Sequence, residues 1–357
     1  MATTRADPFA VIETAAPEFD NATVASIVRE HFGLDARLKP LLGERDQNFR
    51  LQCADGSEFV LKIANAAEDR EATDFQIQAL LYLESWLAEH ACPIVVPKIV
   101  PTRCGKSHVL VEWNAQVHVA RIVTFVPGVP LGDAPLSDRL CRRLGGYLAY
   151  LGQALRDFQH PASSHGLLWD MQQALEMRKI VNFIGDPQLE EAVSRTLDDF
   201  ESHALPRFAD LRTQVIHSDL NPDNVMIAPD DADEVTGVID FGDMVRAPLI
   251  VDVAIGASYM RAVSGNPLLH IADFVAGYHA VTPLERSEID LLLDLIRARL
   301  AASIAILAWR ASMRGPDDPY LAGTNAIESG AAMFLGILDQ MPRDETRRTL
   351  RQVCAAV

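Results

Sequence analysis

Three polar residues in two neighbouring motifs have the types and spacing that phosphoryl transfer requires. Residues 215–227 read VIHSDLNPDNVMI, in which Asp219 and Asn224 follow His217 in the order H-x-D-x-x-x-x-N. Downstream, two apolar residues lead into Asp240 of the triplet DFG. A kinase needs a carboxylate to accept the proton of the attacking hydroxyl, and an amide oxygen and a second carboxylate to bind Mg²⁺. We therefore expect Asp219 to be the catalytic base, and Asn224 and Asp240 to bind the metal.

Simpler interpretations exist for parts of this segment. The sequence N-P-D-N at residues 221–224 is typical of an Asx-rich turn between two strands. The presence of both motifs, in order, favours the catalytic interpretation. His217 could be a general base, but we expect it to brace the backbone of the loop. Asp252 could hydrogen-bond the catalytic loop or be the acid at a helix N-terminus.

A nucleotide site is expected upstream, around Lys62. This lysine lies in the apolar strand pattern FVLKIA, where its burial is costly unless it meets an anion such as a phosphate. An edge-strand lysine that faces water is the alternative. The preceding segment, residues 41–51, has a single glycine, Gly43, and we expect its Arg45 and Asn48 to fold over the phosphates.

In a kinase site an acidic residue on the next helix orients the lysine. Residues 71–90 have helical spacing and carry three candidate acids, Glu71, Asp74 and Glu84. Gln76 is the best-placed residue, but it is not acidic. Asp74 is the preferred partner of Lys62.

A strand pattern at residues 119–126 stops at the strong breaker Pro127-Gly128. An exposed connection of this kind offers free backbone N–H and C=O groups to a purine edge. We expect the backbone of Thr124 and Val126 to bind the base.

The expected elements divide the chain into a small β-rich half and a larger helical half. This is an α+β arrangement of two lobes, with a nucleotide-binding lobe at residues 1–126, including an N-terminal arm at 1–20, and a helical lobe with the catalytic loop and acceptor site at 127–357. The expected strands are 47–53, 58–64, 108–113, 119–126 and the segments on either side of a hairpin turn at 229–234; the expected helices are 22–33, 71–90, 137–160, 168–204 and the region from 249 onward.

Composition limits the function classes. The 357 residues exceed one usual core, and the net charge of −17 disfavours nucleic acid and anionic membranes as partners. Five scattered cysteines without a CxxC pair suggest reduced thiols in a cytoplasmic protein. The N-terminus lacks the pattern of a secretory signal, and the apolar run at 300–309 is too short to span a bilayer. The sequence does not predict an oligomeric state.

These motifs resemble the aminoglycoside phosphotransferase and choline kinase family, and within it hydroxylysine kinases and the kinase domains fused to some class III aminotransferases. There are two departures: Ser218 stands where such loops commonly have Gly or Asn, and Gln76 stands where relatives place an acid. The likeness is carried by GERDQNFRL (43–51), VLKI (60–63), RIVTFVPG (121–128), LLWD (167–170), VIHSDLNPDNV (215–225), GVIDFGD (237–243) and AWR…DDPYL (308–321).

The resemblance implies a protein-kinase-like fold and ATP- or GTP-dependent phosphorylation of a hydroxyl on a small, amine-bearing molecule. A cationic or zwitterionic hydroxy-amine similar to hydroxylysine is the leading acceptor; an aminoglycoside, homoserine or choline is the alternative. Trp169 and Asp170 suit an ammonium group, although a packing Trp and a helix-start Asp explain them equally well. A nucleotide-binding pseudokinase is a further alternative, but the intact Asp219, Asn224 and Asp240 argue against it.

Overall fold

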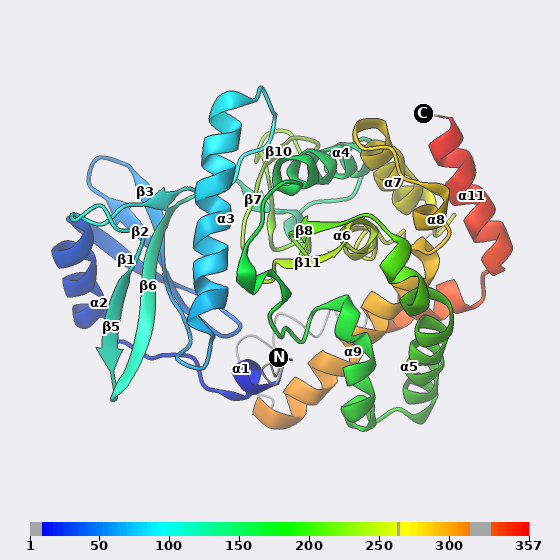
Figure 1. Ribbon diagram of the computed structural model, residues 1–357, viewed down its shortest axis with the longest axis horizontal. Helices are drawn as coiled ribbons and strands as arrows, with labels where there is room; N and C mark the ends of the chain where they lie inside the picture. Colours follow the sequence, from blue (N-terminus) through cyan, green and yellow to red (C-terminus); the bar gives the residue numbers. More distant parts are fainter. Residues whose placement is uncertain (1–8, 263–264, 315–329, 357) are drawn as a thin grey trace. The chain divides into compact units, whose positions relative to one another are not determined.

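The computed structural model describes residues 9–262, 265–314 and 330–356 (Figure 1). The chain forms two compact units. Unit 1 contains Met1–Ala91, Val95–Pro127 and Gln159–Gly166, and unit 2 contains Cys92–Ile94, Gly128–Phe158 and Leu167–Val357. The main break between the units follows Pro127. Unit 1 also includes the later segment Gln159–Gly166, so one cut in the sequence does not separate the two units.

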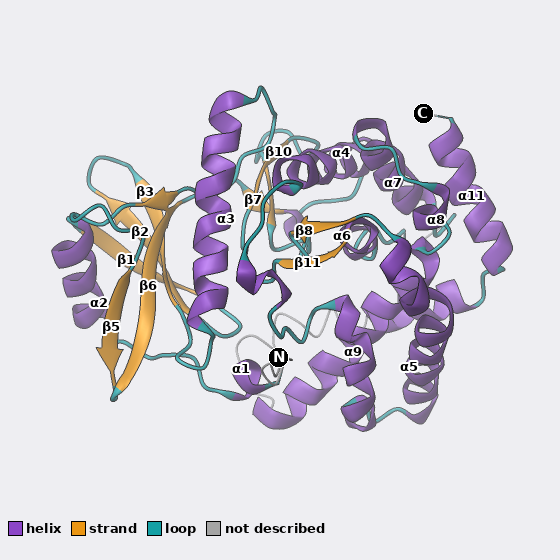
Figure 2. Ribbon diagram, viewed as in Figure 1, coloured by secondary structure: helices purple, strands orange, loops and turns teal. Residues whose placement is uncertain are grey.

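Unit 1 is built on an antiparallel sheet in the order β1-β2-β3-β6-β4, with β5 paired to β6 (Figure 2). The antiparallel sheet followed by a mostly helical remainder confirms the predicted α+β class. The first strand was not predicted, because it contains Pro40 and is half exposed, so its alternation is weak. The strands are β1 (Ala36–Leu41), β2 (Gln47–Cys53), β3 (Glu58–Ile63), β4 (Ile99–Val100), β5 (Val109–Trp113) and β6 (Gln116–Thr124).

Helices cover both faces of this sheet (Figure 1). On one face, α2 (Asn21–Ile27) and the π-helical turn η1 (Val28–Phe32) pack against inward side chains such as Leu61 and Ile122. The turn ends at Gly33, whose φ of 73° is left-handed. The other face is covered by α3 (Arg70–Glu89), an amphipathic helix capped by Asp69. This second face carries the polar residues of interest.

Unit 2 is mostly helical. Its helices α4 and α7 approach so closely that only glycine fits at two crossing positions. A Cβ atom at Gly145 would lie 1.8 Å from the carbonyl oxygen of Phe274, and one at Gly277 would lie 1.8 Å from that of Arg142. The helices are α4 (Asp138–Leu155), α5 (Pro187–Asp199), α6 (Leu249–Ala257), α7 (Leu269–Val281), α8 (Arg286–Ile289), α9 (Leu292–Arg314) and α11 (Arg343–Ala355), and residues 330–339 are also helical.

The predicted helical stretch 168–204 is not continuous. Residues Met171–Lys179 form a 3₁₀ helix (η4), and α5 starts afresh after Gly185, which has a φ of 77°. Asp186 caps the new helix and Pro187 occupies its first turn. A left-handed glycine followed by a proline therefore divides the segment.

Short strands in unit 2 hold the catalytic loop. β8 (Thr213–Ile216) pairs with β11 (Val245–Pro248), which was not predicted. β9 (Val225–Ile227) pairs with β10 (Val235–Val238) through the predicted turn, and also with β7 (Val129–Pro130). Gly128 precedes β7 with a φ of 141°, and a Cβ atom there would lie 2.8 Å from the carbonyl oxygen of Ile227. The chain that follows the predicted breaker Pro127-Gly128 thus joins the sheet that supports the catalytic loop.

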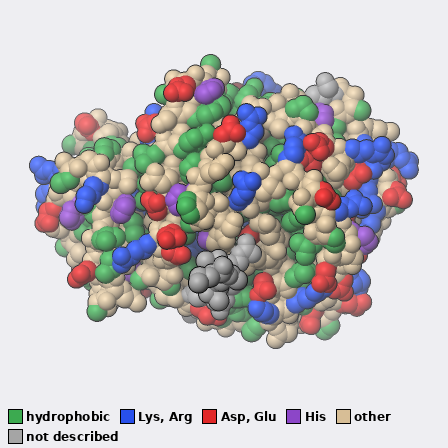
Figure 3. All heavy atoms as spheres, in the orientation of Figure 1, with side chains coloured by type: hydrophobic (Ala, Val, Ile, Leu, Met, Phe, Trp, Pro, Cys, Tyr) green, Lys and Arg blue, Asp and Glu red, His purple; other side chains and the backbone are tan. Residues whose placement is uncertain are grey.

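None of the helices in the described ranges combines the length and apolar character that crossing a bilayer requires. On the face shown in Figure 3, acidic and basic side chains are interspersed over the surface.

Candidate active site

The backbone of the predicted catalytic loop is held by two buried side chains. The carboxylate of Asp252, on α6, accepts the N–H groups of His217 at 3.1 Å and Ser218 at 2.8 Å. The His217 ring contacts the carbonyl oxygen of Ile239 through Nε2 at 3.1 Å, and its Nδ1 accepts the N–H of Asp219 at 3.3 Å. These contacts support the bracing role of His217 and leave its ring nitrogens occupied.

Ser218 has a φ of 66°, in the left-handed region that favours glycine and asparagine. The residue is fully buried, and its hydroxyl has no hydrogen-bond partner among the described residues. The conformation gives a physical reason for the Gly or Asn that the resembling loops carry here. Serine adopts it because Asp252 holds its backbone N–H.

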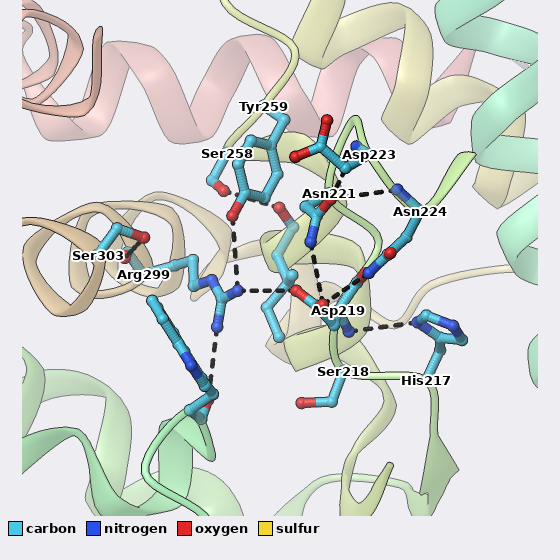
Figure 4. Close-up of polar contacts among 12 residues, drawn as sticks. His217, Ser218, Asp219, Asn221, Asp223, Asn224, Ser258, Tyr259, Arg299 and Ser303 are labelled. Carbon is cyan, nitrogen blue, oxygen red and sulfur yellow. Dashed lines mark hydrogen bonds and ion pairs between the residues drawn. The ribbon is translucent and has the colours of Figure 1, made fainter. Parts of the chain in front are cut away.

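The carboxylate of Asp219 has two different sides (Figure 4). Its Oδ2 accepts hydrogen bonds from the side-chain amides of Asn221 at 3.0 Å and Asn224 at 2.7 Å. Its Oδ1 accepts a hydrogen bond from Nη2 of Arg299, on α9, at 3.2 Å. The loop therefore orients the carboxylate from one side, and a residue 80 positions away holds it from the other.

Asn224 and Asp240 are brought together by the β9–β10 hairpin. The N–H of Ile239, next to Asp240, donates to the carbonyl oxygen of Asn224 at 2.9 Å. Since Nδ2 of Asn224 donates to Asp219, its amide oxygen points elsewhere and accepts no hydrogen bond from the described residues. Asp240 is exposed and has a φ of 59°. An amide oxygen and a carboxylate are hard ligands of the kind that Mg²⁺ prefers, so the two residues fit the expected metal.

Burial and neighbouring charges perturb three ionisable groups of this loop. Burial raises the pKa of Asp219 well above its usual range, Asp243 raises it further, and Arg299 opposes both effects. Burial lowers the pKa of His217 to about 4, so its imidazole is neutral near pH 7. Burial raises the pKa of Asp252 to about 6, although the two N–H groups that it accepts favour the charged form.

The predicted acceptor residues are both buried. The guanidinium of Arg299 lies over the ring of Trp169, with its central carbon 4.7 Å from the centroid. The side chain of Asp170 caps η4 by accepting the N–H of Gln172 at 2.9 Å. Trp169 therefore packs against a buried side chain, and Asp170 caps a helix. Contact of either residue with an acceptor stays a prediction.

Arg299 was missed by sequence reasoning, yet a signal for it exists. It lies just before the apolar run of residues 300–309 and is only 2% exposed. A cation in apolar surroundings must meet an anion, and this holds for Arg299 as it does for Lys62. What the sequence cannot supply is the identity of that anion.

In unit 1, three predicted or neighbouring polar residues lie on one face of the sheet. Lys62 on β3 is opposite Asn48 on β2 and Arg121 on β6. Residues directly opposite in an antiparallel sheet point to the same face, which is the face covered by α3. Lys62 is partly exposed, and Arg121 is buried.

The predicted phosphate loop is the tight β1–β2 connection at residues 42–46. A Cβ atom at Gly43 would lie 2.5 Å from the carbonyl oxygen of Asp46 and 2.6 Å from Nδ2 of Asn48, so only glycine fits. Asn65 fastens the loop, because its amide donates to the carbonyl oxygen of Arg45 at 3.3 Å.

A polar network of Arg121, Gln76 and Glu68 lies under α3. Nη2 of Arg121 donates to Oε1 of Gln76 at 2.5 Å, and Nε2 of Gln76 donates to Glu68 at 3.0 Å. Burial raises the pKa of Glu68, and the carboxylate of Asp46 raises it further. Asp74 is half exposed and contacts Nε2 of His160 at 3.2 Å. Its pairing with Lys62 stays a prediction.

The two predicted base-binding residues differ in their backbone contacts. The N–H of Thr124 donates to the carbonyl oxygen of Lys98 at 2.9 Å. The backbone of Val126 makes no hydrogen bond within the described residues. This difference favours Val126 over Thr124 as a partner for a base. The segment DDPYL of the resemblance lies outside the described residues, whereas Arg310 of AWR is fully buried in α9.

Comparison with known proteins gives consistent matches. Residues 37–288 match the model of the phosphotransferase enzyme family. A hydroxylysine kinase of Danio rerio is 25% identical over 345 residues, which cover 93% of this chain and 95% of that protein. A homoserine kinase of Nitrobacter winogradskyi is 30% identical over 213 residues, 60% of each protein.

Solved structures show the same fold. An amicoumacin kinase in complex with AMP-PNP and Ca²⁺ superposes with a TM-score of 0.66 at 17% identity, covering 91% of this chain and 95% of that one. A microcompartment-associated aminopropanol kinase superposes with a TM-score of 0.61, also at 17% identity, covering 88% and 97%. These likenesses confirm the predicted kinase-like fold.

Proposed function

We propose that this chain, which belongs to the phosphotransferase enzyme family and is a small-molecule kinase, phosphorylates a hydroxyl group of an amine-bearing metabolite. The γ-phosphate of ATP or GTP is the group transferred, and Mg²⁺ is the metal. A hydroxylysine-like compound is the leading acceptor, because the match to the hydroxylysine kinase of Danio rerio extends over nearly the whole of both chains. Homoserine is the second candidate, because the match to the homoserine kinase of Nitrobacter winogradskyi covers only 60% of the chain.

One observation carries the proposal: Asp219 is oriented by Asn224, which lies beside Asp240 in the β9–β10 hairpin. A base and two hard oxygen ligands, fixed by hydrogen bonds, form the arrangement that phosphoryl transfer to an alcohol needs. An ordinary Asx turn does not require that the side chain closing it should also contact a buried carboxylate.

The chemistry assigned to these residues is in-line transfer. The acceptor oxygen forms a bond to the γ-phosphorus as the bond from phosphorus to the β–γ bridging oxygen breaks, and the proton of the hydroxyl moves to the carboxylate of Asp219. Asn221 and Asn224 keep that carboxylate in place, so little reorganisation is needed at the moment of reaction. Asn224 and Asp240 would hold Mg²⁺, which when bound would supply positive charge to offset that of the phosphates.

Unit 1 supplies the nucleotide contacts in this proposal. Lys62 binds the α- and β-phosphates, and the loop with Arg45 and Asn48 covers them. The backbone groups of Val126, which make no hydrogen bond within the described ranges, pair with the edge of the base. The buried Gln76 and Arg121 stabilise the face of the sheet from which Lys62 projects.

Turnover measurements test the proposal. The purified chain is given Mg²⁺ and ATP or GTP with 5-hydroxylysine, homoserine, choline and an aminoglycoside in turn, and we expect the highest kcat/KM for 5-hydroxylysine. Asp219→Asn should lower kcat by a factor on the order of 10³, because it removes the proton acceptor. Removal of the metal with EDTA should abolish turnover.

The matched control is Asp223→Asn, the same chemical change at an exposed position of the same loop. It should leave kcat near that of the wild type. Turnover that survives Asp219→Asn would contradict the assigned role of this residue. Nucleotide binding without turnover of any acceptor would indicate a pseudokinase instead.

A further inference from the structure

The guanidinium of Arg299 is buried beside the base with its hydrogen-bonding capacity incompletely used. Nη2 donates to Asp219 at 3.2 Å and to the hydroxyl of Tyr259 at 3.5 Å, and Nη1 donates to the carbonyl oxygen of Trp169 at 3.5 Å. Charge-assisted hydrogen bonds of this type are usually about 2.7–2.9 Å long. Nε is buried and has no hydrogen-bond partner among the residues that the structure describes. Since a buried cation normally has its donors satisfied, the long contacts and the unpartnered Nε leave this guanidinium with hydrogen-bonding capacity for a further anionic acceptor.

The arginine lies on one defined side of Asp219 (Figure 4). Oδ2 of the carboxylate faces Asn221 and Asn224, the latter being the expected metal ligand. Oδ1 faces Arg299. In the proposed function the nucleotide phosphates accompany the metal on the side of Asn224, so the acceptor extends from its reacting hydroxyl towards the other side of the base, where Arg299 lies.

The surroundings of Arg299 suit a planar anion. Trp169 covers one face of the guanidinium, which leaves its edge as the route for hydrogen bonds. Asp219 and Asp243 act electrostatically on Arg299, so the arginine supplies positive charge within acidic surroundings. A fork of N–H donors in a fixed plane matches a carboxylate through two parallel hydrogen bonds.

We propose that Arg299 binds a carboxylate of the acceptor, so that the enzyme selects hydroxy-amino acids over amino alcohols and aminoglycosides. This inference rests on the proposed function, because it concerns the acceptor of that same site. It assigns Arg299 as an acceptor-binding residue in addition to its contact with the base. In a hydroxy-amino acid a few carbons separate the hydroxyl from the carboxylate, so one molecule can contact both Asp219 and its neighbouring arginine.

Pairs of acceptors that differ only in the carboxylate test the proposal. Homoserine is compared with homoserinamide and with 3-aminopropan-1-ol, and 5-hydroxylysine with 1,5-diaminopentan-2-ol. For the wild type we expect kcat/KM to be about 100-fold higher for the carboxylate member of each pair. Arg299→Lys, which keeps the charge but loses the planar fork, should reduce this ratio to about 10 or less, and Arg299→Met should bring it close to 1.

The matched control is Arg297→Met, on the same helix. Arg297 is also buried, but it pairs with Asp199 and Asp339 rather than with Asp219. Its loss should lower stability and leave the acceptor ratio at the wild-type value. If both Arg299 variants fail to fold, Tyr259→Phe, which removes one contact of the guanidinium, should still lower the ratio.

The outcomes separate the two proposals. Equal turnover of both members of each pair by the wild type would overturn the inference and leave the kinase function intact. Loss of kcat for both members at an unchanged ratio would also overturn it, because Arg299 would then act only through Asp219 or the transferred phosphoryl group. No turnover of any acceptor would instead contradict the proposed function, and with it the inference.

Discussion

Two buried polar clusters, one in each unit, are held together in different ways. In unit 2 the loop around Asp219 is fixed through its backbone. The N–H groups of His217 and Ser218 donate to the carboxylate of Asp252. In unit 1 the cluster under α3 is a chain of side chains, from Arg121 through Gln76 to Glu68.

The difference teaches which cluster tolerates change. A loop held by its backbone keeps its shape only if each residue can adopt the required φ, and every buried N–H must find an acceptor. A chain of side chains depends on the chemical identity of its links, and it can be rebuilt with other residues.

Breaking the anchor of the unit 2 loop should have the largest effect. Asp252→Ala leaves two buried N–H groups without an acceptor, which should lower the free energy of unfolding by about 2–5 kcal/mol. Displacement of Asp219 should lower kcat by about 100-fold. Urea unfolding and turnover measure both effects. Asp252→Asn retains one acceptor oxygen and should lie between this variant and the wild type; an unchanged kcat for Asp252→Ala would contradict the anchoring role.

Cutting the middle of the unit 1 chain should have an intermediate effect. Gln76→Met removes a hydrogen-bond partner from both Arg121 and Glu68, and should lower the free energy of unfolding by about 2 kcal/mol while raising the KM for the nucleotide more than it lowers kcat. Gln78→Met, on the exposed side of the same helix, is the control and should change stability by less than about 0.5 kcal/mol. Equal losses in the two variants would show that the network contributes nothing specific.

The pH dependence of stability should expose two opposing groups in the unit 2 loop. The pKa of His217 is lowered to about 4, so the unfolded chain gains its proton first and stability falls as the pH drops from about 6.5 towards 4. The pKa of Asp252 is raised to about 6, so stability falls as the pH rises from about 4 to 6.

Between pH 4 and 6 the contribution of His217 opposes that of Asp252, and the raised pKa of Asp219 acts in the same direction as that of Asp252. His217→Gln removes the first of these contributions, and its free energy of unfolding should then decrease with rising pH by about 1–2 kcal/mol more than that of the wild type over this window. Urea unfolding at a series of pH values, without metal or nucleotide, measures the difference. Parallel curves for the variant and the wild type would contradict the opposing titrations.

The smallest effect should come from relieving the backbone at Ser218. Ser218→Gly suits a φ of 66° and removes a buried hydroxyl without a partner, so it should stabilise the protein by up to about 1 kcal/mol and preserve turnover. Ser218→Val should instead destabilise it, because a β-branched residue is strongly disfavoured there. Thermal melts of the two variants give the comparison, and equal melting temperatures would contradict the strain.

The sequence by itself determined the features that are local. The spacing of Asp219, Asn224 and Asp240 predicted the candidate site, because one loop and one hairpin carry all three residues. The turn at residues 229–234 and the strands on either side of it were predicted for the same reason. A pattern that lies within a few neighbouring turns of the chain needs no knowledge of the rest of the fold.

Only the tertiary structure decided the partners that come from far along the chain. Arg299 reaches Asp219 across 80 residues, and Gln76 meets Arg121 across 45. Such pairs depend on how helices pack on loops and sheets, which the residue types alone do not specify. The sequence alone also did not predict the left-handed φ of Ser218. The hydrogen bond that accompanies this conformation comes from Asp252, which is 34 residues away.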